Sequence, residues 1–137
     1  MGGKTKTEIF DPSATLKKTQ SAIFDELNRL KHLFGARPSQ EESVYEYDPN
    51  GNLDTITDPL DRITDHEYNA LNQITDTIYR ESDQTEIARA SMTYDDWGNI
   101  ETVTDLNGKT TTYTYNGLGD LKTIVSPDTG TTTMTYD

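Results

Sequence analysis

Hydrophobic and polar residues alternate in short segments along most of the chain. The hydrophobic or aromatic partners in each segment are Tyr45 and Tyr47, His66 and Tyr68, Met92 and Tyr94, Tyr113 and Tyr115, and Met134 and Tyr136. A glutamate or threonine stands between the two members of every pair. Alternation with a period of two indicates a strand with one packed face and one solvent-facing face. The pattern therefore predicts antiparallel β-strands.

Each alternating segment ends at an aromatic residue followed by Asp or Asn, and these pairs recur at a regular interval. Tyr47, Tyr68, Tyr94, Tyr115 and Tyr136 follow one another at intervals of 21, 26, 21 and 21 residues, and Phe24 lies 23 residues before Tyr47. A fixed period in this range is typical of repeat proteins. The sequence predicts hairpin units of about 21 residues. The extra residues of the 26-residue interval, around positions 80–84, are interpreted as a protruding loop.

The residue four positions after the aromatic is Gly or Asn in five units, and both residue types tolerate a positive φ. The Asp or Asn directly after the aromatic can close a turn by accepting a backbone hydrogen bond. This spacing predicts one hairpin turn per unit. The predicted structural motif consists of Phe24, Asp25, Asn28, Tyr47, Asp48, Gly51, Tyr68, Asn69, Asn72, Tyr94, Asp95, Gly98, Tyr115, Asn116, Gly119 and Tyr136. An earlier, degenerate unit at Phe10 has Ala14 in the fourth position.

Aliphatic residues recur six and nine positions after the aromatic, for example Leu53 and Ile56. Six and nine differ in parity, so both cannot lie on one face of a regular strand. Our hypothesis is that the sixth residue plugs the turn and the ninth lies in the strand. Turn-forming residues at 58–61, 105–108 and 126–130 predict a second turn in each unit.

Residues 21–34 are open to two interpretations. Ile23, Leu27, Leu30 and Phe34 have the spacing of an amphipathic helix, with Gly35 after them. The same segment matches the repeat, which is the favoured interpretation. The predicted organisation is a disordered or cloning-derived end at 1–9, degenerate repeats at 10–35, a linker at 36–43 and the main repeat array at 44–137.

The strings Tyr47-Asp48-Pro49-Asn50-Gly51-Asn52-Leu53 and Tyr115-Asn116-Gly117-Leu118-Gly119-Asp120-Leu121 resemble the YD repeat of the Rhs family. That family includes insecticidal toxin-complex cocoon subunits and teneurins. The resemblance implies an all-β array of antiparallel hairpins, as a ribbon or partial shell. It also implies a secreted or cell-surface protein. In long members of the family the ribbon forms a hollow shell around a toxin segment. Two differences are Asp61 where the family has Gly, and Asn, Gln or Asp in most places where it has Arg.

Composition changes this picture in two ways. Leu, Ile, Val and Phe total 25 of 137 residues at a net charge of −12, which is typical of disordered chains, but the repeat pattern overrides that prediction. The acidic surface argues against nucleic-acid or anionic-membrane partners. The chain has no cysteine, no apolar stretch of membrane-spanning length and no signal peptide at its start.

No residue pattern predicts catalysis, a cofactor or a metal. His66 is expected to pack on its strand and His32 to face solvent, while the calcium-loop-like start at Asp48 fails at Leu53 and Pro59. Trp97 is expected to pack within its turn; the alternative is an exposed ring that contacts a ligand such as a sugar.

The sequence therefore predicts a non-catalytic structural module of a shell or spacer that encloses or presents a partner such as a toxin segment. The alternative is a β-repeat module that binds a glycan or a receptor. The strand at 133–136 alternates Met134 and Tyr136 with threonines and has no charge or proline. Such an edge predicts self-association or pairing with neighbouring repeats.

Overall fold

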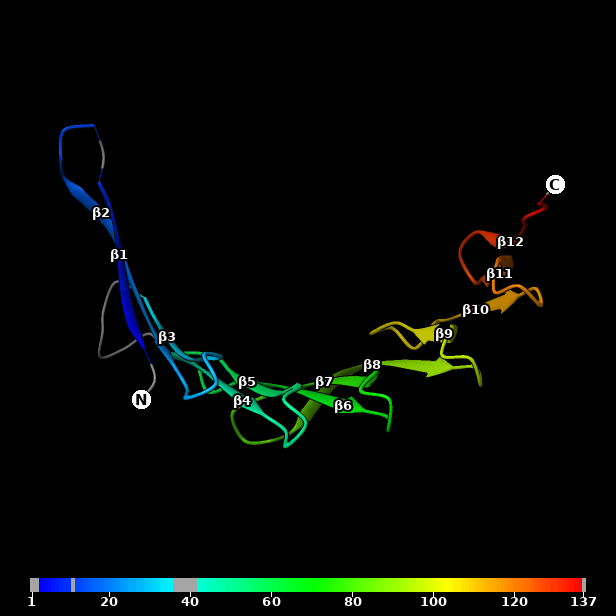
Figure 1. Cartoon of the computed structure of the whole chain (residues 1–137), viewed down its shortest axis with the longest axis horizontal. Coiled ribbons are helices and arrows are strands. Elements are labelled where there is room, and N and C mark those ends of the chain that lie inside the picture. The colour runs from blue at the N-terminus through cyan, green and yellow to red at the C-terminus, as the bar shows by residue number, and fades with distance from the viewer. Residues whose placement is uncertain (1–2, 11, 36–41, 137) are drawn as a thin grey trace. The chain divides into compact units, whose positions relative to one another are not determined.

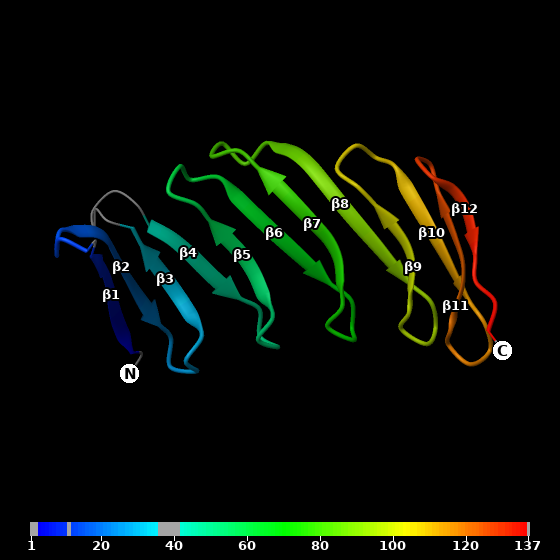
Figure 2. The same cartoon turned by 90° about the horizontal axis from the view of Figure 1, so that it is seen from above.

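The computed structural model describes residues 3–10, 12–35 and 42–136, which form twelve β-strands and, within those ranges, no helix. The strands are β1 (Lys4–Phe10), β2 (Leu16–Phe24), β3 (Leu30–Phe34), β4 (Glu42–Tyr47), β5 (Leu53–Thr57), β6 (Ile63–Tyr68), β7 (Ile74–Arg80), β8 (Glu86–Tyr94), β9 (Ile100–Thr104), β10 (Thr110–Tyr115), β11 (Leu121–Ser126) and β12 (Gly130–Thr133). They follow sequence order in one antiparallel sheet (Figures 1 and 2). The all-β prediction is confirmed.

The chain divides into two compact units. The first comprises residues 1–65 with 80–85, and the second comprises residues 66–79 with 86–137. In the first unit, β1 to β5 form successive antiparallel pairs. In the second unit, β8 to β12 do the same. Each unit is thus built by repetition of one hairpin.

A β-bulge beside each aromatic–Asx turn resolves the parity conflict seen in the sequence. Tyr47 pairs with Leu53, whereas Tyr45 pairs with Ile56, so one extra residue of β5 lies between the two pairs. The same register shift occurs between β2 and β3, β8 and β9, and β10 and β11. Directly paired residues share a face, so the bulge brings both aliphatic positions to the face of the tyrosines. The sixth residue begins the strand rather than plugging the turn.

The N-terminal region is more regular than the sequence suggested. Residues 21–34 form the end of β2, a turn and β3, so the hairpin interpretation holds and the helical one is wrong. Strand β1, Lys4–Phe10, covers residues 4–9 of the end predicted to be disordered, because these residues pair along β2. Ala14, in the fourth position of this degenerate unit, adopts the left-handed conformation with φ 60°. Of the predicted linker, residues 36–41 lie outside the described residues, and Glu42 and Ser43 begin β4.

The insertion in the 26-residue interval is not a protruding loop. It lengthens β7 to 7 residues and β8 to 9, whereas β9 has 5 and β10 has 6. The connection is an ordinary turn, in which the N–H of Glu81 donates to the carbonyl of Thr85 at 2.9 Å and that of Gln84 donates to the carbonyl of Glu81 at 3.0 Å. The added residues extend the hairpin because they can continue its ladder of hydrogen bonds.

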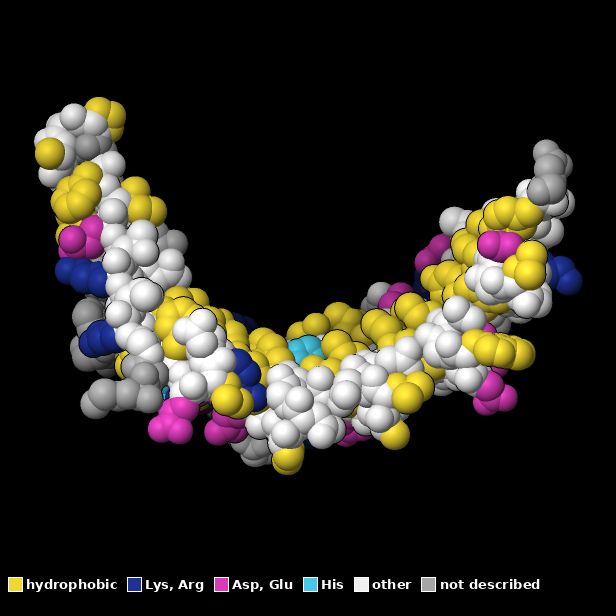
Figure 3. Space-filling view, viewed as in Figure 1, with side chains coloured by type: hydrophobic (Ala, Val, Ile, Leu, Met, Phe, Trp, Pro, Cys, Tyr) yellow, Lys and Arg dark blue, Asp and Glu magenta, His cyan; other side chains and the backbone are white. Residues whose placement is uncertain are grey.

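The sheet has almost no buried interior within the described residues. Ile78, at 1% exposure, is the only fully buried hydrophobic residue among them. Large hydrophobic side chains are exposed in both units. Figure 3 shows hydrophobic side chains, in yellow, at the surface of the molecule. Stability must therefore depend strongly on the hydrogen-bonded turns and on contacts between neighbouring hairpins. The described residues contain no helix of a length and hydropathy that would cross a membrane.

Candidate functional site

The turns place their fourth residues in the left-handed region. The φ values are 61° for Asn28, 94° for Gly51, 59° for Asn72, 84° for Gly98 and 86° for Gly119. Asp61 and Gly108 do the same in the second turns, with φ 60° and 76°. Asp61, where the Rhs pattern has Gly, therefore keeps the glycine-type conformation. The second turns at 58–62 and 105–109 therefore have the same backbone conformation as the turns that follow the motif aromatics.

A hydrogen-bond network fixes each turn, as Asp95 illustrates. Its Oδ1 accepts the backbone N–H groups of Trp97 at 3.0 Å and Asn99 at 2.8 Å, and its Oδ2 accepts Nδ2 of Asn99 at 3.0 Å. Two backbone bonds close the turn, from Asp95 N–H to the Asn99 carbonyl and from Gly98 N–H to the Asp95 carbonyl. The residue five positions after the aromatic is therefore a member of the turn motif.

The two side chains of this network match as donor and acceptor. Where the first is Asp, the fifth-position residue supplies an N–H donor, in the pairs Asp25–Arg29, Asp48–Asn52, Asp58–Arg62 and Asp95–Asn99. Where the first is Asn, the fifth-position residue supplies an oxygen acceptor, in the pairs Asn69–Gln73 and Asn116–Asp120. From the sequence alone, only the presence of Asn, Gln or Asp in most places of the Rhs arginine was recognised. In the sequence, Asp is followed four residues later by a donor side chain, and Asn by a side chain with an acceptor oxygen. This correlation could have revealed the pairing.

The motif tyrosines link each hairpin to the one before it. Their hydroxyl groups donate to the backbone carbonyl of the sixth-position residue of the preceding repeat: Tyr47 to Leu30 at 2.8 Å, Tyr94 to Ile74 at 2.7 Å, Tyr115 to Ile100 at 2.9 Å and Tyr136 to Leu121 at 2.8 Å. An aromatic residue with a polar tip is well suited to this bridge. A phenylalanine could supply the packing but not the hydrogen bond.

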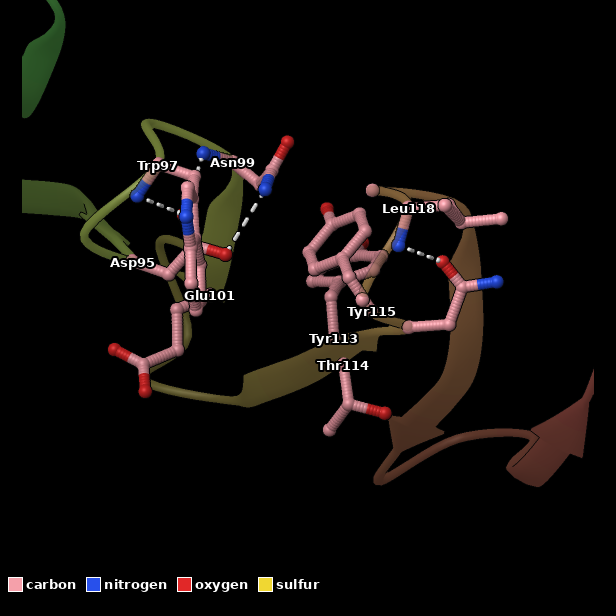
Figure 4. A pocket seen from close by; sticks show the side chains of 11 residues that line it. Asp95, Trp97, Asn99, Glu101, Tyr113, Thr114, Tyr115 and Leu118 are labelled. Carbon is pink, nitrogen blue, oxygen red and sulfur yellow. Dashed lines mark hydrogen bonds between the residues drawn. The ribbon is translucent and has the colours of Figure 1, made fainter.

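A slot lies between the turns of two consecutive repeats in the second unit. Residues Thr102–Thr104 of β9 pair with residues Thr110–Thr112 of β10. Beyond these three pairs, the two strands have no ladder pairs towards the turns. The resulting slot of about 480 Å³ is lined by Trp97, Asn99, Glu101, Tyr113, Tyr115 and Leu118, together with neighbouring turn residues. Figure 4 shows Trp97, Asn99 and Glu101 on one side and Tyr113, Tyr115 and Leu118 on the other.

The length of the fifth-position side chain distinguishes this slot from the corresponding places beside Arg29 and Gln73. The guanidinium of Arg29 lies over the ring of Tyr47, 4.3 Å from its centroid. Nε2 of Gln73 reaches the next turn and donates to the carbonyl of Gly98 at 2.9 Å. Asn99 is shorter, and its Nδ2 donates to Asp95 within its own turn. The slot between turns 94–100 and 115–121 is open because the chain has no long side chain there.

The RHS Repeat family model matches residues 47–84 and 94–131, more than half of the chain. The chain belongs to the RHS repeat family. The matched segments contain the turns that follow Tyr47, Tyr68, Tyr94 and Tyr115, and the resemblance stated from the sequence is confirmed.

Solved structures show the same fold as this RHS-repeat chain. A crystal structure of TcdB2-TccC3-Cdc42 is similar with a TM-score of 0.68 and 19% identity, over 98% of this chain and 9% of that one. The structure of TcdB2-TccC3-TEV gives 0.67 and 19%, over 98% and 8%. The structure of TcdB2-TccC3 without its hypervariable C-terminal region is similar with a TM-score of 0.57 and 19% identity, over 93% of this chain and 7% of that one. The chain thus spans less than a tenth of these relatives. No curated relative matches it in sequence.

Trp97 does not pack within its RHS-repeat turn as the sequence analysis expected. It is 86% exposed, and the equivalent Leu118 of the next repeat is 89% exposed. The third position after the aromatic lies at the tip of the turn, where the backbone directs the side chain away from the sheet. Leu27 and Leu71 occupy the same position and are 73% and 71% exposed. Exposed apolar side chains in adjacent turns are a feature that a binding partner can use.

The two histidines make structural contacts. Nδ1 of His66 in β6 lies 3.2 Å from Oγ1 of Thr77 in β7. His32 contacts the carboxylate of Glu42 and stacks on Phe34, so it is half-buried rather than solvent-facing. Within the described ranges, no three His, Cys, Asp or Glu side chains gather as a metal site.

The turn aspartates make the stability of the protein sensitive to acid. The side-chain hydrogen bond from Asn99, reinforced by turn N–H groups, holds the pKa of Asp95 below its usual value, and hydrogen bonds from Asn52 and Lys109 do so for Asp48 and Asp105. A lowered folded-state pKa stabilises the protein above the unfolded-state pKa of about 3.9 and loses this effect as the pH falls through the folded-state value. We expect the urea midpoint, followed by circular dichroism, to drop below about pH 4.

The variant Asp95→Asn isolates this effect from the relief of charge repulsion at a net charge of −12. The turn accepts Asn, as Asn69 and Asn116 show. Between pH 5 and pH 3 the variant should lose less stability than the native chain. Equal losses in the two proteins would contradict the assigned role of Asp95.

Proposed function

We propose that this chain is a non-catalytic structural module of an RHS-repeat shell or spacer. The parent is a secreted toxin or cell-surface protein, and the module encapsulates or presents a partner segment. The family and the fold support the structural role. The repeated turn networks and tyrosine bridges supply stability to a single layer of hairpins without a conventional core.

The observation that carries the proposal is the unequal character of the two sheet faces. In the second unit, the register places Met92 beside Val103 and Tyr113 beside Ile124 on one face. The opposite face carries paired threonines, such as Thr93 with Thr102 and Thr114 with Thr123. The described strands belong to one sheet, so within this unit no second layer covers the apolar face. A face of this kind can hold an unfolded, apolar segment.

A labelled, permanently unfolded polypeptide rich in leucine and phenylalanine tests this role. We expect it to bind with a rise in fluorescence anisotropy and to be protected from proteolysis. Val103→Glu, which places a charge on the apolar face, should weaken binding at least tenfold, because an unpaired charge must then be desolvated. Thr102→Glu, the adjacent change on the opposite face, is the control and should leave binding unchanged. No binding by a folded native chain, or equal effects of the two variants, would overturn the proposal.

The edge strand β12 supports association with neighbouring repeats or with a second copy. Gly130–Thr133 pair with β11 on one side, and the threonines carry no charge that opposes pairing on the other. We expect this 137-residue chain to form dimers or end-to-end arrays at tens of micromolar. Light scattering after size exclusion measures this directly, and Met134→Lys should shift the population towards monomer. A uniform 15.4 kDa species would contradict the expectation.

A further inference from the structure

We propose that the slot between turns 94–100 and 115–121 binds an arginine side chain presented by a partner peptide. Tyr113 and Tyr115 line the slot from the apolar face. The proposal nevertheless does not depend on the shell function, because its cation site is built with the turn residues Asp95, Trp97 and Asn99. Its support comes from the occupant of the equivalent slot in the first unit.

In the first unit, the chain fills the equivalent slot with its own arginine. Nε of Arg29 donates to Oδ2 of Asp25 at 2.8 Å, and the second terminal nitrogen lies 2.7 Å from the same oxygen. The guanidinium carbon lies 4.3 Å from the centroid of Tyr47. The site thus combines a carboxylate with the electron-rich face of an aromatic ring, which together favour a planar cation.

The slot in the second unit has the same two recognition groups without the cation. Asp95 corresponds to Asp25, Tyr115 corresponds to Tyr47, and the short Asn99 replaces Arg29. Burial raises the pKa of the Tyr115 hydroxyl, and the carboxylate of Asp95 raises it further. For Tyr47 burial acts in the same direction, but the charge of Arg29 opposes it. The positive charge that Arg29 supplies in the first slot is therefore missing from the slot in the second unit.

Two further differences make the open slot more attractive to an external cation. Trp97 replaces Leu27 and adds a second aromatic ring, the best type for cation–π contacts. Glu101 replaces Lys31, so a carboxylate stands where the first unit has a positive charge. The slot of about 480 Å³ is within the usual range for ligand sites. The net charge of −12 also favours the approach of a basic segment.

Trp97 provides the measurement, because it is the only tryptophan in the chain. The probe is the capped peptide Gly-Arg-Gly, compared with the same peptide containing citrulline, which keeps the planar shape of arginine but is neutral. We expect the arginine peptide to change the Trp97 emission saturably, with a dissociation constant in the millimolar range. The citrulline peptide should bind at least tenfold more weakly, and added salt should weaken the arginine peptide.

The variant Asn99→Arg fills the slot with the chain's own side chain. The pairs Asp25–Arg29 and Asp58–Arg62 show that the turn accepts arginine in this position, so the variant should fold normally. Its affinity for the arginine peptide should fall at least tenfold. Asn107→Arg, which adds the same charge on an exposed second turn, is the control and should reduce affinity much less.

Three results would overturn the proposal. They are equal binding of the arginine and citrulline peptides, full affinity in a folded Asn99→Arg variant, and saturable quenching by a neutral oligosaccharide such as maltohexaose with none by the arginine peptide. The last result would instead assign the Trp97 slot to sugar recognition. These outcomes are distinguishable from a failure of the shell proposal, because the two tests use different signals. Binding of the small peptides is followed by Trp97 emission, whereas binding of the unfolded polypeptide is followed by the anisotropy of its own label.

Discussion

Replacing Gly98 by valine is expected to lower the free energy of unfolding by about 1–3 kcal/mol. Gly98 has φ 84°, a conformation that a β-branched residue resists. An added Cβ would also lie 3.3 Å from Nε2 of Gln73, which donates to the Gly98 carbonyl at 2.9 Å. The substitution therefore strains the turn and its link to the preceding repeat. Urea denaturation followed by circular dichroism measures the change.

Gly117 is a matched control from the next turn. It does not have a positive φ, and an added Cβ there would have no atom within 4 Å. Gly117→Val should change stability by less than about 0.5 kcal/mol, as surface substitutions usually do. Equal stability of the Gly98 variant and the native chain would contradict the assigned turn geometry.

The second large effect is expected from Asn116→Asp, which breaks the donor–acceptor rule of the turns. Nδ2 of Asn116 donates to Oδ2 of Asp120 at 2.9 Å, so the variant places two carboxylates against each other. Charges about 4 Å apart repel by roughly 1–4 kcal/mol between the limits of water and a protein surface. Chemical denaturation at pH 7 should show a loss in this range. The loss should shrink at about pH 4, where the carboxyl pair can share a proton.

The second substitution Asp120→Asn should rescue the Asn116→Asp variant. The double variant has the same Asp–Asn pair as Asp48 and Asn52, whose side chains bond at 2.9 Å. The two substitutions should therefore show a coupling energy of opposite sign to the single loss, which a double-mutant cycle measures. Additive effects would show that the fifth-position side chain does not contribute to the turn.

The features that the sequence predicted are those set by local physical chemistry. The fourth-position residues, such as Gly51 and Asn72, could be identified because a positive φ restricts the choice of residue. The alternation around Glu46 and Thr114 gave the strands because a half-exposed strand has a period of two. The disorder expected from composition did not follow, because composition ignores the repeated spacing that lets one hairpin pair with the next.

The remaining features depend on neighbouring hairpins, which single-sequence patterns do not describe. Ala14 adopts φ 60° because the register of β1 on β2 requires a turn there, whichever residue is present. The bulge beside Tyr47 was hidden because parity arguments assume a regular strand. The slot beside Trp97 depends on how far Asn99 reaches towards the next turn, whereas Arg29 and Gln73 reach further in their own turns. These distances exist only after folding.

Residue-resolved amide hydrogen exchange tests the central claim, that repeated turn networks and successive hairpins hold together a single-layer sheet. We expect slow exchange for the turn amides of Asp48, Asp95 and Asn116. Their N–H groups donate to the backbone carbonyls of Asn52, Asn99 and Asp120, respectively, at 2.9 Å in each case. We also expect protection along the paired strands β4, β5 and β8 to β11. Random-coil exchange rates at these turns and strands under native conditions would contradict the claim.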